Sequence, residues 1–190
     1  MPTVSSATRV APLQAPYDRE IEQTLERMMP PGVPPLKLFR TVAHNPHLLD
    51  KLRSTGSYLL NFGTLAAADR EVVIHRVCGR CGCEYEWGVH VEFFGRAVGL
   101  TDAQLDSTVS GSASDPVWSP RQALLIELVD QLHDTGTVDD EVWSRLAASY
   151  DEPQLVELVT LVGQYHAVSF VANALGVELE DGAARFRGSA

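Results

Sequence analysis

The side chains best suited to chemistry are concentrated within residues 71–90. This stretch holds all three cysteines of the 190-residue chain, two of its six histidines and three glutamates. On a helix, Cys83, Glu86 and His90 would lie on one stripe, because positions i, i+3 and i+7 share a face. An apolar stripe lies beside it, and partial burial of a thiol, a carboxyl and an imidazole shifts their pKa values. The pattern therefore predicts an active site.

The spacing of these residues resembles a motif of the carboxymuconolactone decarboxylase and alkylhydroperoxidase D superfamily. The peroxidase branch of that superfamily carries Glu, eleven residues, Cys, two residues, Cys, three residues and His. Glu71, Cys83 and His90 match this pattern in the present sequence. Glu86 stands where the peroxidase branch has its second cysteine, so three of the four positions match.

A later segment, residues 158–179, also resembles the superfamily, and the likeness spans roughly residues 35–180. It implies an all-α, alkylhydroperoxidase D-like helical fold with a small molecule as substrate. It also implies a homo-oligomer (a dimer, trimer or hexamer), because protomers of known members share interfaces that help to form the site. The resemblance does not fix the reaction.

Cofactor-free acid–base chemistry, as in the lactone decarboxylase branch, is the first hypothesis. Loss of carbon dioxide from a lactone acid, or migration of its double bond, develops enolate-like charge and needs a proton delivered to carbon. His90 has an unperturbed pKa near neutrality and would be the acid or base. Glu71 would orient it or share its proton, and Glu86 would tune the pair. This chemistry requires neither a metal nor an organic cofactor.

A thiol peroxidase with antioxidant activity is the second hypothesis, and Cys83 would be its attacking thiolate at a helix N-terminus. The presence of this cysteine argues against the lactone decarboxylase branch, whose members do not rely on a cysteine in this motif. Glu86 cannot form the disulfide of the peroxidase branch, so Cys78, Cys81 or a small external thiol would resolve the sulfenic acid. Against this reading, Glu84 and Glu86 beside the sulfur would raise its pKa.

Two further interpretations stay open. Cys78, Cys81 and Cys83 with either His75 or His90 form a less favoured zinc set, because only one C-x-x-C pair is present. Alternatively, the chain is a non-catalytic helical binding or assembly protein whose polar side chains are structural. Each residue alone fits that description better, whereas the whole set at motif spacing favours catalysis.

The composition limits the expected partners and location. Fifteen basic against twenty-five acidic residues give a formal net charge of -10, and without a basic cluster we expect no nucleic-acid partner. Three cysteines within six residues are a poor disulfide framework, and the first fifteen residues lack a secretory pattern, so we expect a reducing cytoplasm. The longest apolar segment, residues 155–175, is interrupted by polar side chains, which predicts a buried helix and no membrane partner.

Periodicity, caps and glycines predict an all-α chain of seven to nine helices. The expected helices cover residues 18–29, 37–43, 46–61, 66–77, 83–98, 101–109, 120–136, 139–150 and 151–175. Gly79 and Gly82 are expected to bend the chain between the two helices of the motif. The domain is expected to span residues 17–180, after a flexible arm of residues 1–16 and before a tail of residues 181–190.

Two other features carry weaker expectations. The proline-rich run of residues 29–35 could close over a pocket, but a plain connector is the favoured interpretation. In the last helix His166, Ser169 and Asn173 share one face, where a structural role is favoured over lining a pocket.

Overall fold

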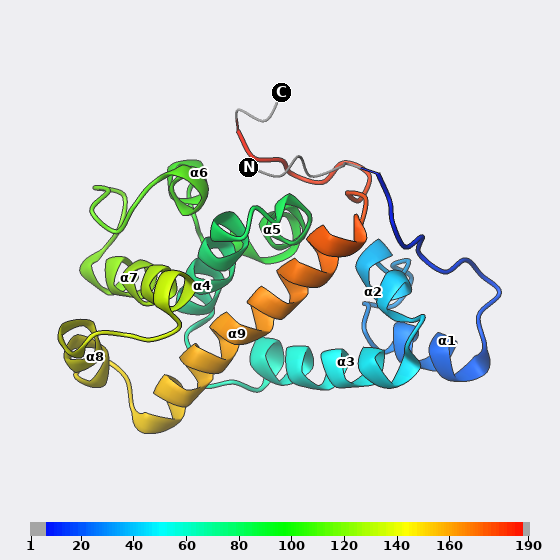
Figure 1. Ribbon diagram of the computed structural model, residues 1–190, viewed down its shortest axis with the longest axis horizontal. Coiled ribbons are helices and arrows are strands. Elements are labelled where there is room, and N and C mark those ends of the chain that lie inside the picture. The colour runs from blue at the N-terminus through cyan, green and yellow to red at the C-terminus, as the bar shows by residue number, and fades with distance from the viewer. Residues whose placement is uncertain (1–6, 188–190) are drawn as a thin grey trace.

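The computed structural model describes residues 7–187 and has a single all-α domain, as the sequence predicts. Figure 1 shows the long helix α9 crossing the molecule between the other helices. The described residues contain no strand. Their helices are α1 (Arg19–Glu26), α2 (Lys37–Val42), α3 (Pro46–Asn61), α4 (Ala67–Arg80), α5 (Glu84–His90), the π-helical turn η1 (Val91–Gly95), α6 (Asp102–Ser110), α7 (Pro120–Thr135), α8 (Asp140–Ala147) and α9 (Glu152–Leu175).

Helix α4 lies at the centre of the core. It packs against α6, α7 and α9, and the side chains of Val72, Val73 and Ile74 are fully buried. Three successive side chains point in different directions around a helix, so they are all buried only because neighbouring helices cover several sides of α4. Glu71 precedes them on the same helix and is therefore positioned by the most enclosed element of the domain.

Local caps fix the ends of several helices. The hydroxyl of Thr101, the hydroxyl of Ser119 and the carboxylate of Asp151 open α6, α7 and α9, each in a capping box. Gly136 and Gly176 end α7 and α9 with φ of 72° and 66°, in the left-handed region that favours glycine. These signals lie within a few residues in the sequence, which explains why the starts of these three helices were predicted to within one residue.

The bend between the two helices of the motif comes from Gly82, which has a φ of 60°. Gly79 lies inside α4, which continues to Arg80, so the expectation that Gly79 also breaks the helix is wrong. Its role is in packing. A Cβ at position 79 would lie 2.3 Å from the carbonyl oxygen of Thr108 at the facing end of α6. Only a residue without a side chain lets the two helices approach so closely.

Gly79→Ala should therefore destabilise the fold, although alanine has the higher helix propensity. The added methyl group meets backbone atoms that cannot rotate away, so we expect a loss of about 1–3 kcal/mol of unfolding free energy, measured by urea denaturation. Gly163→Ala in α9 is the matched control, because nothing lies within 4 Å of a Cβ there. It should gain up to about 1 kcal/mol. Equal responses of the two variants would contradict the close contact.

The described parts of the predicted arm and tail are fastened to the domain. The backbone N–H groups of Arg9 and Val10 donate to the carbonyl oxygen of Leu175 at 2.9 and 3.1 Å. At the other end, the N–H of Phe186 donates to the carboxylate of Glu84 at 2.8 Å. Both segments therefore rest on helices of the domain, and their remaining terminal residues lie outside the described range.

Among the described residues, α9 is the one helix whose length and apolar composition would suffice to cross a membrane. In this fold 50% of its most apolar stretch is buried. The buried side includes the carboxylate of Glu157, which accepts a hydrogen bond from the N–H of Thr64 at 2.7 Å. Helix α9 thus acts as a core element against which α3, α4, α5 and α8 pack.

Candidate active site

Glu71 and His90 meet across the bend between α4 and α5. The Nδ1 atom of His90 lies 2.8 Å from Oε2 of Glu71, and both side chains are buried. Because a carboxylate only accepts, Nδ1 carries the proton and the second ring nitrogen, Nε2, points away from Glu71. The structure thus brings together two motif residues that are 19 positions apart in the sequence.

Glu86 and Tyr165 occupy the other side of the imidazole. The Nε2 atom of His90 lies 3.5 Å from Oε1 of Glu86 and 3.1 Å from the hydroxyl oxygen of Tyr165. Glu86 precedes His90 by one turn of α5, whereas Tyr165 comes from α9. His90 is therefore held between two carboxylates and a phenol.

This environment favours the protonated imidazole. Burial would lower the pKa of His90, but the carboxylates of Glu71 and Glu86 together outweigh burial and raise that pKa to about 9. Burial would raise the pKa of Glu71, but the charge and hydrogen bond of His90 lower it. At neutral pH the pair is therefore an imidazolium with a carboxylate.

His75 takes the opposite protonation state. Burial, and then the nearby charge of His90, lower the pKa of His75 to about 4. Its Nδ1–H donates to the backbone carbonyl oxygen of Glu71 at 2.7 Å. The rings of His75 and His90 meet edge-on, with centroids 6.0 Å apart. His75 is thus a neutral packing partner of His90 and not a second acid.

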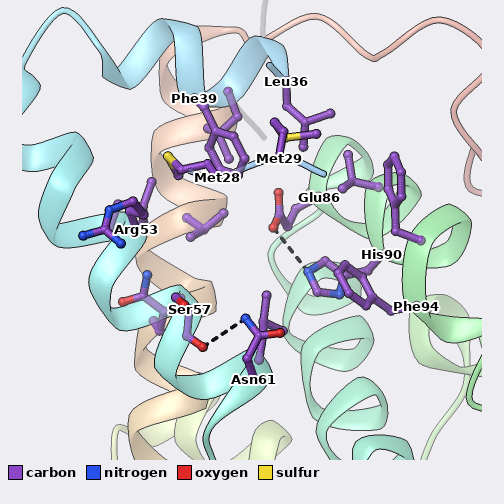
Figure 2. A pocket seen from close by; sticks show the side chains of 18 of the residues that line it. Met28, Met29, Leu36, Phe39, Arg53, Ser57, Asn61, Glu86, His90 and Phe94 are labelled. Carbon is purple, nitrogen blue, oxygen red and sulfur yellow. Dashed lines mark hydrogen bonds and ion pairs between the residues drawn. The ribbon is translucent and has the colours of Figure 1, made fainter. Parts of the chain in front are cut away.

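A cavity of about 370 Å³ opens onto His90 and Glu86, a volume suited to a small molecule. Figure 2 shows these two side chains on one wall, facing Ser57 and Asn61 of α3 across the cavity. Most of the wall is apolar, formed by Met28, Met29, Leu36, Leu38, Phe39, Leu52, Leu60, Val89, Phe93, Phe94 and Val168. An apolar cavity with a few convergent polar groups is the usual form of a ligand site.

The proline-rich run of residues 29–35 contributes to this wall, because Met29 and Pro30 both line the cavity. The favoured interpretation of a plain connector therefore holds only for residues 31–35, which are not among the residues that line the cavity. Helix α1 ends at Glu26, three residues before its expected end, and the chain beyond it passes along the cavity.

The three cysteines lie outside the cavity lining. Cys83 is the N-cap residue of α5 and is fully buried, and burial raises the pKa of its thiol to about 12. Burial also raises the pKa of Cys78 and of the partly exposed Cys81. All three are free cysteines. In this conformation the predicted redox candidates are protonated thiols that a ligand in the cavity does not touch.

Sequence reasoning missed the polar residues that line the cavity besides Glu86 and His90, among them Tyr165, Arg27 and Arg53. Tyr165 lies in a segment that resembles the superfamily, and this was the available signal for it. Arg27 and Arg53 line the cavity from the end of α1 and from α3. An arginine on a polar helix face gives no sign in the sequence that it faces a cavity, so nothing could have identified these two.

Comparisons with known proteins agree with this architecture. No family model and no curated protein matches the sequence. Among solved structures, an uncharacterized peroxidase-related protein from Ralstonia eutropha JMP134, described as an alkylhydroperoxidase AhpD core, has a TM-score of 0.77 at 15% identity, covering 92% of this chain and 95% of its own. A peroxidase-related protein from Silicibacter sp. TM1040 has a TM-score of 0.76 at 14% identity, covering 98% and 93%.

The debrominase Bmp8 in its apo form is also similar, with a TM-score of 0.71 at 15% identity over 93% of this chain and 94% of its own. At these identities the likeness establishes the fold. The chain therefore has the alkylhydroperoxidase D-like fold, as the spacing of Glu71, Cys83 and His90 predicted.

Proposed function

We propose that this protein is a cofactor-free acid–base enzyme that decarboxylates or isomerises a small enolisable compound such as a lactone acid. One observation carries the proposal: the side chains of His90 and Glu86 line the same apolar cavity, with Nε2 of His90 3.5 Å from Oε1 of Glu86. An acid and a base next to each other are what proton transfer at carbon requires.

The chemistry divides between these two groups. The Nε2–H of His90 would donate to a substrate carbonyl oxygen and stabilise the negative charge that develops there. In an isomerisation, Glu86 would remove a proton from the adjacent carbon and return it at another position. In a decarboxylation, the electron pair of the breaking C–C bond would enter the same enolate, carbon dioxide would leave, and His90 would deliver the proton to carbon. Glu71 would keep His90 oriented throughout and would favour its reprotonation from solvent after a decarboxylation.

The cavity also supports a substrate class. Its apolar lining suits an unsaturated carbon skeleton, and the apolar surroundings strengthen hydrogen bonds to a developing oxyanion. Arg27 and Arg53 line the same cavity and would pair with a substrate carboxylate. Figure 2 shows Arg53 on the α3 side, with His90 on the far side. A small unsaturated acid with a carbonyl group would therefore suit this cavity, because its carboxylate would pair with the arginines and its carbonyl group would accept from His90.

A thiol peroxidase is the second candidate, favoured by the peroxidase-related descriptions of two structures with this fold. The geometry around Cys83 supports it less. Peroxide attack needs a thiolate, but burial raises the pKa of this thiol to about 12. Glu86 occupies the position from which the motif's second thiol would act. A peroxidase cycle would therefore need a conformational change that exposes Cys83.

An isotope-exchange experiment separates the two candidates. The protein is incubated in D₂O with a panel of small unsaturated lactone acids, and loss of C–H signals and of carboxyl groups is followed by NMR. We expect turnover in the wild type and in Cys83→Ser, and no C–H exchange in Glu86→Gln. A parallel assay adds hydrogen peroxide with a small thiol as reductant. Peroxide turnover that disappears in Cys83→Ser, with no exchange in any panel member, would overturn the proposal in favour of the peroxidase.

A further inference from the structure

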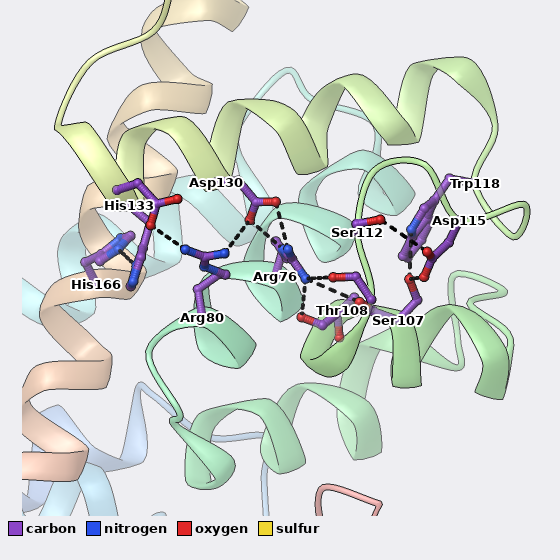
Figure 3. Close-up of polar contacts among 12 residues, drawn as sticks. Arg76, Arg80, Ser107, Thr108, Ser112, Asp115, Trp118, Asp130, His133 and His166 are labelled. Carbon is purple, nitrogen blue, oxygen red and sulfur yellow. Dashed lines mark hydrogen bonds and ion pairs between the residues drawn. The ribbon is translucent and has the colours of Figure 1, made fainter. Parts of the chain in front are cut away.

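A second group of chemically versatile side chains lies outside the cavity lining. Cys81, His133 and His166 come from the C-terminal end of α4, from α7 and from α9, and one ligand-type atom of each lies within 4.8 Å of the others. Figure 3 shows His133 and His166 in contact beside Arg80. We infer that these three residues bind one zinc ion, with one coordination position left for water or an external ligand.

His166 is already oriented as a ligand. Its Nδ1 lies 2.9 Å from the carbonyl oxygen of Val162, one turn earlier on α9, so Nδ1–H donates there and Nε2 keeps its lone pair. A backbone carbonyl that fixes the tautomer in this way is the common companion of a metal-binding histidine. The free Nε2 points at Nδ1 of His133, 2.9 Å away.

The spacing matches what zinc requires. With zinc–nitrogen bonds of about 2.0–2.1 Å at a tetrahedral angle, two ligating nitrogens lie about 3.3 Å apart. The observed 2.9 Å between the rings of His133 and His166 needs to open by only a few tenths of an ångström. The sulfur of Cys81 lies within 4.8 Å of one ring nitrogen of each histidine, so a side-chain rotation would have to bring it closer to the ion.

A hydrogen bond from α9 fixes the backbone of Cys81 next to the two histidines. The side-chain amide of Asn173 on α9 donates to the carbonyl oxygen of Cys81 at 2.8 Å. The polar face of α9 that carries His166 and Asn173 thus supplies both a ligand and a support for a second ligand. The sequence favoured a structural role for this face over lining a pocket, and metal binding would give it a chemical role.

The proton and charge balance is also favourable. On zinc binding the thiol of Cys81 releases its proton to solvent, and the proton on Nδ1 of His133 transfers to Nε2 of the same ring. The nearby positive charge of Arg80 is offset, because its guanidinium forms ion pairs with Asp130 and Asp134. One thiolate and two imidazoles are a ligand set that suits zinc, and all three side chains are partly exposed, so an ion can enter.

This site differs from the zinc set that the sequence suggested. That set combined Cys78, Cys81 and Cys83 with either His75 or His90, whereas the proposed site takes only Cys81 from it. The two other ligands lie 52 and 85 positions further along the chain. No local spacing rule could have identified them.

Cobalt titration of the untagged, chelator-treated full chain tests the site, because cobalt(II) reports thiolate coordination through a charge-transfer band. We expect one equivalent to bind, the band to appear, and zinc to displace the cobalt. Cys81→Ser should abolish the band. His133→Ala and His166→Ala should each weaken binding by more than about 100-fold, the upper range for losing a supporting second-shell group.

Two control variants make the assignment specific. Cys83→Ser removes a buried thiol of the other proposed set, and His47→Ala removes an exposed imidazole. Both should bind cobalt as the wild type does, and circular dichroism checks that every variant is folded. Absence of binding, binding without the charge-transfer band, or loss of the band in Cys83→Ser would each overturn the proposal. If Cys81→Ser does not fold, His133→Ala still tests the site, because His133 is partly exposed and its replacement should leave the fold intact.

Discussion

His90→Gln should lower kcat/KM for an enolisable substrate by about a hundred- to ten-thousand-fold, the usual contribution of a positioned acid or base. Glutamine keeps a side chain of similar length but has no proton to deliver at neutral pH. It also leaves the buried carboxylate of Glu71 without its cationic partner. Steady-state kinetics with the best substrate of the exchange panel measures the loss, and His47→Gln, at an exposed position, is the control.

The pH profile gives this prediction a second, independent readout. Because the carboxylates raise the pKa of His90 to about 9, the acid form persists through neutrality and kcat/KM should fall as the pH rises through about 9. The same ion pair stabilises the fold fully below the ordinary histidine pKa of 6.5, and this contribution is lost as the pH rises toward about 9.

Glu71→Gln provides the matched test of positioning. It should move the falling limb of the profile to lower pH, because the strongest attraction on the imidazolium is gone. A merely structural Glu71 would leave the limb in place. A folded His90→Gln protein that retains a third or more of the wild-type activity would remove His90 from the catalytic role.

The fold was largely readable from the sequence because its signals are local. Capping residues such as Ser119 and terminators such as Gly176 act within one turn of the helix end that they define. Where a residue's role depends on packing against an element distant in the sequence, local sequence patterns predict that role wrongly. Glycine is a residue type that predicts a helix break, yet Gly79 lies inside α4 and packs against α6. Only the position of Thr108 in the fold shows this.

The candidate site divides in the same way. Glu71, Glu86 and His90 were identified because they lie on two helices joined by a short bend, so sequence spacing carries their geometry. Tyr165 joins them from α9, 75 positions after His90. Cys83 shares the spacing, but its burial depends on packing that a pattern does not encode. The sequence therefore predicts the group of motif residues, and the structure decides which of them a ligand can reach.

Arg76→Met should be the most destabilising substitution, with an expected loss of about 3–5 kcal/mol of unfolding free energy, because the backbone carbonyls of Thr108 and Gly111 would lose a charged hydrogen-bond donor. The guanidinium of Arg76 is 3% exposed and binds both carboxylate oxygens of Asp130, each at 2.7 Å. Its Nη1 also faces the backbone carbonyls of Ser107, Thr108 and Gly111, at 3.0–3.3 Å. Figure 3 shows that the contacts of Arg76 connect α4 with α7 and with the end of α6.

Urea denaturation measures the loss, and Arg145→Met is the matched control. Arg145 also pairs with a carboxylate, that of Glu127, but its side chain is 44% exposed, so we expect a change of about 0–1 kcal/mol. A loss below about 1 kcal/mol for Arg76→Met would show that water reaches the buried carbonyls.

The double variant Arg76→Met/Asp130→Leu separates the ion pair from the carbonyl contacts. If the cost of Arg76→Met came from an uncompensated Asp130, removing that carboxylate would restore most of the stability. We expect little recovery. Asp130 is partly exposed, and its Oδ1 lies 3.7 Å from Nη1 of Arg80, whereas the carbonyls of Thr108 and Gly111 have lost the guanidinium as their donor. The hydroxyl of Thr108 also accepts the indole N–H of Trp87, at 3.0 Å. Arg76 thereby fixes the end of α6 that holds α5, the helix carrying Glu86 and His90.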